Sequence, residues 1–161
     1  MKLLLSFDQA TSVAGFAIHR DGKLEKHGKA KFEGTTIERI AQVKQWADAM
    51  ADMLNTSDVE FEIGIEDIQL QQDVTTFKTL AWLQGVLLVL FYEKGIKATT
   101  CFSTEWKSTC GVKGRTRPEQ KRNAQKYVFD TYGIKATQDE CDAICIGDHL
   151  SAQADKVVNW E

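Results

Sequence analysis

Length, composition and charge indicate one soluble domain spanning residues 1–161. The chain is long enough for one sizeable core and too short for two, and 43% hydrophobic with 27% charged residues is ordinary for a globular protein. A net charge of −3 at first argues against nucleic acid as a partner. The longest apolar run, residues 86–92, is far shorter than the ~20 residues that span a bilayer, and the N-terminal run stops at Asp8. We therefore expect no membrane association, no signal peptide and a cytoplasmic location.

Three strands are predicted first. Residues 2–8 form a continuous apolar run that is typical of a buried strand, and residues 13–19 alternate as a second strand. Asp21-Gly22 is a hairpin turn that leads into residues 23–32. Because this third strand is polar, we expect it at the edge of a sheet.

A helix and a strand follow, and then a second helix and strand. Thr35-Thr36-Ile37-Glu38 is a capping box that opens an amphipathic helix reaching Leu54, and residues 59–66 read as the fourth strand. Residues 73–93 form a helix whose second half is apolar nearly all round, and residues 96–102 are the fifth strand.

The next segment is strongly basic. Between Glu105 and Lys126, seven lysines and arginines stand against two glutamates, a net charge of +5 that leaves −8 for the rest of the chain. A charge run is most often only a solvated face. Since this one also contains Gly111, Gly114 and Trp106, we interpret it as a flexible basic loop suited to backbone phosphates.

Two helices complete the chain. Thr116-Arg117-Pro118-Glu119 is a capping box with proline in the first turn, and the helix it opens runs to Tyr132 and is closed by Gly133. The last helix covers residues 139–154. The whole order predicts an α/β fold, a five-stranded mixed sheet with helices on both faces, in which the first strand is central and the fourth lies beside it in parallel.

Four carboxylates are brought together by this arrangement. Asp8 ends the first strand and Glu66 ends the fourth, so both leave the sheet at the same edge, while Asp139 and Asp142 stand one turn apart on the last helix. Such a set makes an oxygen-rich pocket for hard divalent cations, which two-metal phosphodiester chemistry requires. The alternative is that these acids are turn caps and helix-terminus residues.

The remaining titratable residues point to structural roles. Four cysteines contain no CxxC pair, so we expect reduced, mostly buried thiols and no zinc site. His19 and His27 are expected on the strand surface, and His149 in a structural role. The acids expected to be solvated rather than catalytic are Glu60, Glu62, Asp67 and Glu140.

Three motifs resemble those of the RuvC-type Holliday junction resolvases of the ribonuclease H-like superfamily, especially its short phage-borne members. FDQATSVAGF at residues 7–16 is similar to the first-strand motif, and IEDI at residues 65–68 to the motif of the second metal ligand. DECDA at residues 139–143 resembles the C-terminal D-x-x-D-A motif. The stretches that look like the family's DNA-contacting segment are Trp106-Lys107, Gly111-Val112 and Lys121 to Ala124.

The resemblance implies a ribonuclease H-like fold and a Mg²⁺-dependent endonuclease that cuts branched DNA, above all Holliday junctions, with 5′-phosphate products. Two Mg²⁺ ions per site are implied, with Mn²⁺ as a substitute and no organic cofactor. Asp8 would bridge the two ions, Glu66 would hold one, and Asp139 with Asp142 the other. The residues that would contact DNA phosphates are Lys107, Lys113, Arg115, Arg117, Lys121, Arg122 and Lys126.

The same resemblance favours a homodimer, and a host bacterial cytoplasm if the chain is phage-encoded. The apolar helix at residues 73–93 is the candidate interface, with burial inside the monomer as the alternative. Two positions depart from the family pattern. Gln69 stands where cellular members carry the aromatic residue that enters the junction, and Gln9-Ala10 replaces proline and glycine.

Three other functions fit parts of the sequence. Residues 8–12 also resemble the first phosphate loop of sugar kinases and actin-like ATPases, which need two such domains. An RNA-processing nuclease of the same fold would share the carboxylates. A non-catalytic DNA-binding module would share the basic segment but would not need the complete set of acids.

Overall fold

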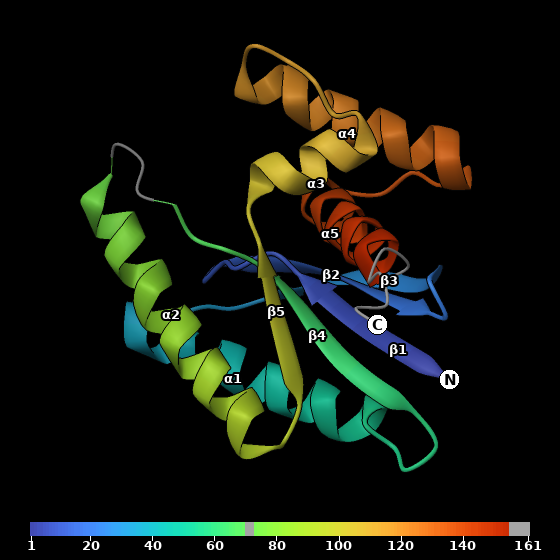
Figure 1. Ribbon diagram of the computed structural model, residues 1–161. Helices are drawn as coiled ribbons and strands as arrows, with labels where there is room; N and C mark the ends of the chain where they lie inside the picture. Colours follow the sequence, from blue (N-terminus) through green and yellow to red (C-terminus); the bar gives the residue numbers. More distant parts are fainter. Residues whose placement is uncertain (70–72, 155–161) are drawn as a thin grey trace, which may run out of the picture.

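A mixed five-stranded sheet forms the centre of the computed structural model, which describes residues 1–69 and 73–154 (Figure 1). The strand order is β3-β2-β1-β4-β5, with β1 antiparallel to β2, β2 antiparallel to β3, and β1, β4 and β5 mutually parallel. This confirms the predicted fold class and the central place of the first strand. The strands are β1 (Lys2–Phe7), β2 (Val13–Arg20), β3 (Lys23–Lys31), β4 (Glu60–Glu66) and β5 (Lys97–Cys101).

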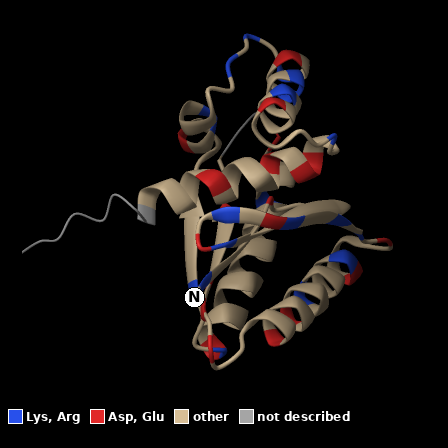
Figure 2. Cartoon of the chain, turned by 90° about the vertical axis from the view of Figure 1, so that its right-hand side faces the viewer, with Lys and Arg blue, Asp and Glu red and all other residues tan. Residues whose placement is uncertain are grey.

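Helices cover both faces of this sheet, as Figures 1 and 2 show from two directions. On one face α1 and α2 pack against each other, and α2 also contacts β5. On the other face α5 lies across β1, β2, β3 and β4, and it carries α3 and α4 on its outer side. The helices are α1 (Thr36–Leu54), α2 (Val74–Glu93), α3 (Ser103–Cys110), α4 (Arg117–Tyr132) and α5 (Gln138–Ala154).

Each face of the sheet has its own apolar core. Under α1 and α2 the core is built on Leu5, Phe7 and Ile63, and Trp46 of α1 meets the Phe7 ring edge-on at 5.4 Å. Under α5 it contains Ile144, Ile146 and the four cysteines, all of which are free thiols, as expected. β1 is an almost continuous apolar run because it is covered on both sides, whereas β4 still carries Glu62 between Phe61 and Ile63.

The central parallel pair sets the position of two predicted site residues. Phe7 pairs with Ile65 across β1 and β4, so the residues that follow, Asp8 and Glu66, leave the sheet side by side. The register therefore confirms that these two acids reach the same edge of the sheet.

Small residues let α5 approach the sheet closely. A Cβ on Gly15 of β2 would overlap the backbone carbonyl of Asp139, and one on Gly64 would overlap Leu150. Ser6 of β1 donates its hydroxyl to the carbonyl oxygen of Ala143 at 2.8 Å. The start of α5, which carries two of the predicted acids, is thereby fixed against the ends of β1 and β2.

The basic segment differs from the predicted flexible loop. Its first part is the helix α3, which begins where Glu105 accepts the backbone N–H of Phe102 at 2.6 Å and ends at Gly111 in the left-handed region, φ 65°. Trp106 and Cys110 lie one turn apart and are both buried against α5. The prediction of a loop was wrong for residues 103–110, because Gly111 marks the end of a helix, whereas Gly114 does lie in the connection between α3 and α4.

Three polar residues, His19, His27 and Glu140, are less exposed than predicted. His19 was expected on the surface but is 1% exposed, with its Nε2 2.7 Å from Oδ1 of Asp148 on α5. Tyr127 and Tyr132 donate to the same carboxylate, at 2.7 and 2.5 Å. His27 and Glu140 are half-buried, with His27 Nδ1 3.0 Å from Glu140 Oε1. Each of these three residues has a partner more than 100 positions away in the sequence, which local patterns do not reveal.

Helix α2 is long and apolar enough, by length and composition alone, to cross a membrane. One side of it is nevertheless part of the apolar core of the sheet, where Leu83, Leu87, Leu90 and Phe91 are buried. The opposite side exposes apolar residues instead of the polar ones that a surface helix normally presents. Those residues are Trp82, Leu88, Val89 and Tyr92.

Candidate active site

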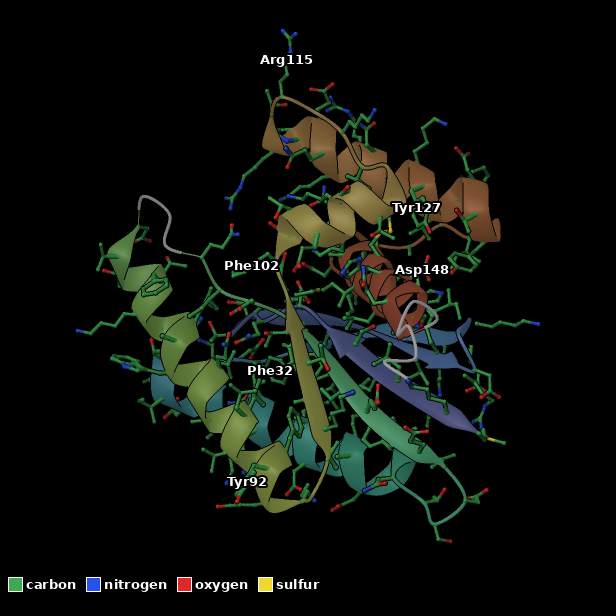
Figure 3. All side chains as sticks on the ribbon, viewed as in Figure 1. Phe32, Tyr92, Phe102, Arg115, Tyr127 and Asp148 are labelled. Atoms are coloured by element: carbon green, nitrogen blue, oxygen red, sulfur yellow. The ribbon has the colours of Figure 1, made fainter. Side chains whose placement is uncertain are left out.

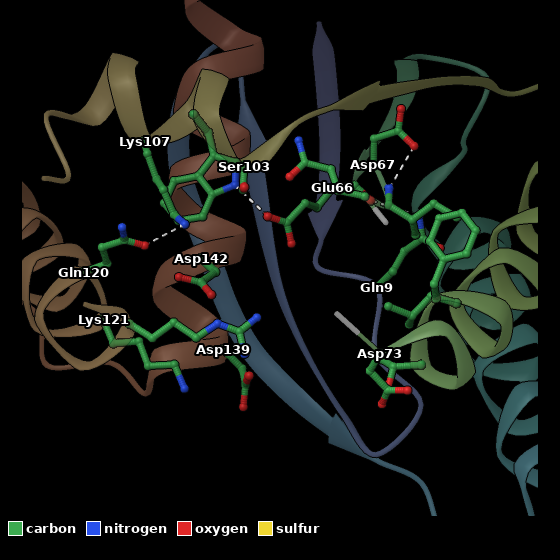
Figure 4. Close-up of a pocket in the computed structure, with 17 residues that line it drawn as sticks. Gln9, Glu66, Asp67, Asp73, Ser103, Lys107, Gln120, Lys121, Asp139 and Asp142 are labelled. Carbon is green, nitrogen blue, oxygen red and sulfur yellow. Dashed lines mark hydrogen bonds between the residues drawn. The ribbon is translucent and has the colours of Figure 1, made fainter. Parts of the chain in front are cut away.

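A cleft of about 1100 Å³ opens at the edge where β1 and β4 end (Figure 4). Glu66 at the end of β4 and Asp139 and Asp142 of α5 lie on one side of its lining. Lys107 of α3 with Arg117 and Lys121 of α4 form a basic wall. The opposite wall belongs to α2 and the segment before it, and includes Gln69, Asp73, Thr76, Phe77 and Leu80.

Asp8 lies deepest among the four predicted acids. Its side chain is almost buried, at 9% exposure, and Oδ1 accepts the backbone N–H of Gly15 at 2.9 Å. Burial raises the pKa of Asp8 well above its usual value, and the charges of Asp142, Asp139 and Glu66 raise it further. Asp8 is therefore within electrostatic range of the other three predicted acids.

Glu66 and Asp142 have the same character. Burial raises the pKa of Glu66, although the Trp106 hydrogen bond and the charge of Lys107 act in the opposite direction. Burial, followed by the charge of Glu66, raises the pKa of Asp142 to about 7. Ionisation of Glu66 and Asp142 in this buried place is unfavourable in free energy, and a bound cation would make it favourable.

A divalent cation fits this donor set. The four carboxylates offer only oxygen ligands, as Mg²⁺ and Mn²⁺ prefer, and strand register and α5 bring them to one place. Within residues 1–69 and 73–154, no three histidine, cysteine or acidic side chains lie close enough together to hold a metal ion as they stand. Mg²⁺ usually keeps several waters besides its carboxylates, so few protein ligands are needed for each ion.

The seven predicted DNA-contacting residues separate into two groups. Lys107, Arg117 and Lys121 line the cleft with the acids. The others lie outside it, on α4 and on the connection between α3 and α4, where Figure 2 shows a concentration of Lys and Arg. Arg115 points outward at the tip of this connection (Figure 3). Lys126 pairs with Asp130 on the surface of α4, Nζ to Oδ2 at 2.6 Å.

Two further residues of the cleft contact Glu66 in a way that the sequence did not reveal. Gln9 donates its Nε2 to the backbone carbonyl of Glu66 at 2.9 Å and to Oε1 of Gln84 on α2 at 2.7 Å. Trp106, expected in a DNA-contacting stretch, is instead buried at 2% exposure, and its indole N–H donates to Oε1 of Glu66 at 3.1 Å. The spacing of Trp106 and Cys110 is a signal for a buried helical face, but nothing local links Trp106 to Glu66.

Other predicted roles are met in part. His149 is buried, with its Nδ1 2.6 Å from the hydroxyl of Thr109, and it does not line the cleft, in keeping with a structural role. Asp67, expected to be solvated, is half-buried in the cleft lining and accepts hydrogen bonds from Ile68 N–H at 2.8 Å and Gln84 at 3.2 Å.

Comparison with known proteins finds likeness at the level of fold. No protein-family model matches this sequence, and no curated protein matches it. RuvC of Thermus thermophilus, in complex with a Holliday junction substrate, superposes with a TM-score of 0.78 at 14% identity over 98% of this chain and 97% of that chain. A second structure of Thermus thermophilus RuvC gives 0.71 at 15% identity over 96% of both chains. The yeast mitochondrial Holliday junction resolvase Ydc2 gives 0.59 at 12% identity over 98% of this chain and 82% of that one.

Proposed function

We propose that this chain, whose fold is that of the RuvC-type resolvases, is a divalent-metal-dependent endonuclease that cuts branched DNA at Holliday junctions. The observation that carries the proposal is the cleft itself. Glu66, Asp139 and Asp142 line it together with Lys107 and Lys121, with Asp8 buried close by. A fold shared with a RuvC that was solved on a Holliday junction supports the choice of substrate.

The carboxylates would hold two Mg²⁺ ions, with Mn²⁺ as a substitute. Bound there, such ions activate water and stabilise the leaving 3′-oxygen of a phosphodiester. Asp8, between strand β1 and helix α5, is the natural ligand to share, and the N–H of Gly15 orients its carboxylate. Glu66 and the pair Asp139 and Asp142 approach from β4 and α5. Because the 3′-oxygen is the leaving group, the phosphate stays on the 5′ end, and the product is a nick that ligase can close.

The basic residues would act on the DNA backbone. Lys107 and Lys121 line the cleft and would neutralise charge that develops on the scissile phosphate. Lys113, Arg115, Arg122 and Lys126 lie farther out and would contact flanking phosphates, which position a duplex without reading its sequence. This division explains how an acidic chain binds a polyanion: its +5 segment supplies one wall of the site.

A homodimer is the second part of the proposal. A four-way junction needs two incisions, and a two-fold dimer places one site near each of the two strands to be cut. The exposed apolar side of α2 is the surface we assign to this interface. Gln84 of the same helix reaches Gln9 and Asp67 at the cleft, so the assigned interface helix and the site are in contact.

The deciding experiment compares cleavage of synthetic four-way junctions, three-way junctions, linear duplexes and structured RNA with Mg²⁺. We expect paired, ligatable nicks in the four-way junction and little cutting of the linear duplex. Asp8→Asn should abolish cleavage while junction binding is retained, which would exclude a purely DNA-binding module. Cleavage of RNA alone, or cleavage unaffected by chelation of metal, would contradict the proposal.

A further inference from the structure

The indole of Trp106 joins the basic wall of the cleft to one of its carboxylates. It is 2% exposed on α3, and its N–H donates to Oε1 of Glu66 at 3.1 Å. The next residue, Lys107, places its ammonium 5.4 Å from the centre of the same ring. In Figure 4 a dashed line joins the indole to one oxygen of Glu66. The ring is therefore packed on one side and hydrogen-bonded on the other.

Glu66 is held at both its backbone and its side chain. Its carbonyl oxygen accepts from Gln9 and its carboxylate accepts from Trp106. A donor that is fixed in a packed ring restricts rotation of the carboxylate group, so Oε1 stays directed at α3. The oxygen left for a cation in the cleft is Oε2.

We propose that Trp106 is a positioning residue that holds Glu66 as a one-oxygen metal ligand and so favours small octahedral cations over Ca²⁺. Mg²⁺ and Mn²⁺ sit in regular octahedra and accept one oxygen from each carboxylate, whereas Ca²⁺ takes more oxygens at longer distances and often both from one carboxylate. If Glu66 cannot turn Oε1 toward the cation, binding of Ca²⁺ by both oxygens of this carboxylate is disfavoured. The inference rests on the proposed function, because it assumes that Glu66 is a metal ligand.

Trp106→Phe is the sharpest substitution, because it removes the N–H and keeps an aromatic ring for packing and for Lys107. Trp46→Phe is the matched control: Trp46 packs on Phe7 in the core on the opposite face of the sheet. Binding of Mn²⁺ and of Ca²⁺ to each protein is measured by titration calorimetry without DNA, and thermal unfolding is recorded alongside.

We expect Trp106→Phe to weaken Mn²⁺ binding about tenfold or more, in line with the 10- to 100-fold effects of removing an outer partner of a metal ligand. Ca²⁺ binding should stay unchanged or tighten, so the affinity for Mn²⁺ relative to that for Ca²⁺ falls. Trp46→Phe should leave the ratio as in the wild type. A merely structural role of Trp106 would lower the melting temperature and weaken both cations equally, and that result would overturn the inference.

A measurement on the wild type covers the case in which Trp106→Phe fails to fold. The indole N–H resonance of Trp106 should move on addition of Mg²⁺, while that of Trp46 should not; an unmoved Trp106 resonance would overturn the inference.

Because no DNA is present in these binding measurements, they test the role of Trp106 separately from the proposed function. A protein that binds Mn²⁺ with the expected selectivity but cuts no junction would contradict the proposed function and leave the role of Trp106 in place. A protein that binds neither Mn²⁺ nor Ca²⁺ would contradict the premise that Glu66 is a metal ligand, and with it the proposed role of Trp106.

Discussion

The buried carboxylates Asp8, Glu66 and Asp142 work against the stability of the metal-free fold, because burial raises the pKa of each. An unfolded aspartate has its usual pKa of 3.8, whereas burial and then the charge of Glu66 raise the pKa of folded Asp142 to about 7. Between these values the folded protein keeps a proton that the unfolded chain has lost. Stability therefore falls as pH rises through this window, because the native state binds more protons than the unfolded state.

We accordingly predict that metal-free protein melts at a lower temperature at pH 7.5 than at pH 5. A tenfold difference between the folded and unfolded acid dissociation constants of one carboxyl changes the free energy of unfolding by on the order of 1.4 kcal/mol. Added Mg²⁺ should restore stability, and more strongly at the higher pH, because it replaces protons on the same oxygens. Asp142→Asn should flatten the dependence in calorimetric melting curves, whereas Asp130→Asn, on the outer surface of α4, should not. A dependence as steep in Asp142→Asn as in the wild type would contradict this explanation.

The lysines of the basic segment allow a second comparison between single residues. Lys107 lines the cleft and is held by Gln120, with Nζ 3.0 Å from Oε1. Lys126 lies outside and pairs with Asp130. We predict that Lys107→Gln lowers the single-turnover cleavage rate about 100-fold or more, as removal of a transition-state donor does. Lys126→Gln should change it only about twofold, as loss of one screened surface contact would. Equal losses would show that the two lysines only attract DNA.

At the scale of elements, the packing of α5 on β2 aligns two of the four acids. Gly15 has no Cβ where the carbonyl of Asp139 lies against it, and its N–H donates to Asp8. We predict that Gly15→Ala forces α5 away from the sheet, destabilises the protein by about 1–3 kcal/mol as overpacking does, and lowers cleavage much more than junction binding. Denaturant unfolding and cleavage rates measure the two effects. Unchanged cleavage in a destabilised variant would show that the position of α5 tolerates this shift.

Elements defined by local patterns were predictable, and those defined by distant partners were not. Apolar runs and capping residues located β1, β4, α1 and α5, and parallel pairing then brought Asp8 and Glu66 together. The helix α3 was missed because the basic residues and glycines around it were interpreted as a loop, although Trp106 and Cys110 stand one helical turn apart. His19 reads as a surface residue of an alternating strand, yet its partner Asp148 lies 129 positions away. The contact of Trp106 with Glu66 escapes local reasoning for the same reason.

Across the whole molecule, two surfaces of opposite character lie close together. The charged cleft opens where β1 and β4 end, between α2 and the helices α3 to α5, whereas the outward side of α2 is apolar, and the charged residues of that helix are Lys78 and Glu93. A membrane would suit that side by composition, but the buried stripe of α2 is already joined to α1 and β5. A second copy of the chain would cover the remaining apolar side and also provide the second cut.

We therefore predict that the protein in solution has twice the 18.1 kDa mass of the chain. Val89→Lys, at a position 55% exposed on α2, should reduce it to the monomer, because a buried lysine without a partner is costly at an interface. Phe129→Lys, 49% exposed on α4, is the matched control and should leave the mass unchanged. Light scattering after size exclusion measures the mass. On four-way junctions the monomer should nick single strands without paired incision, since each chain keeps a complete cleft. A wild type that is monomeric at micromolar concentration, or that sediments with lipid vesicles, would contradict the assignment of this surface to a second copy.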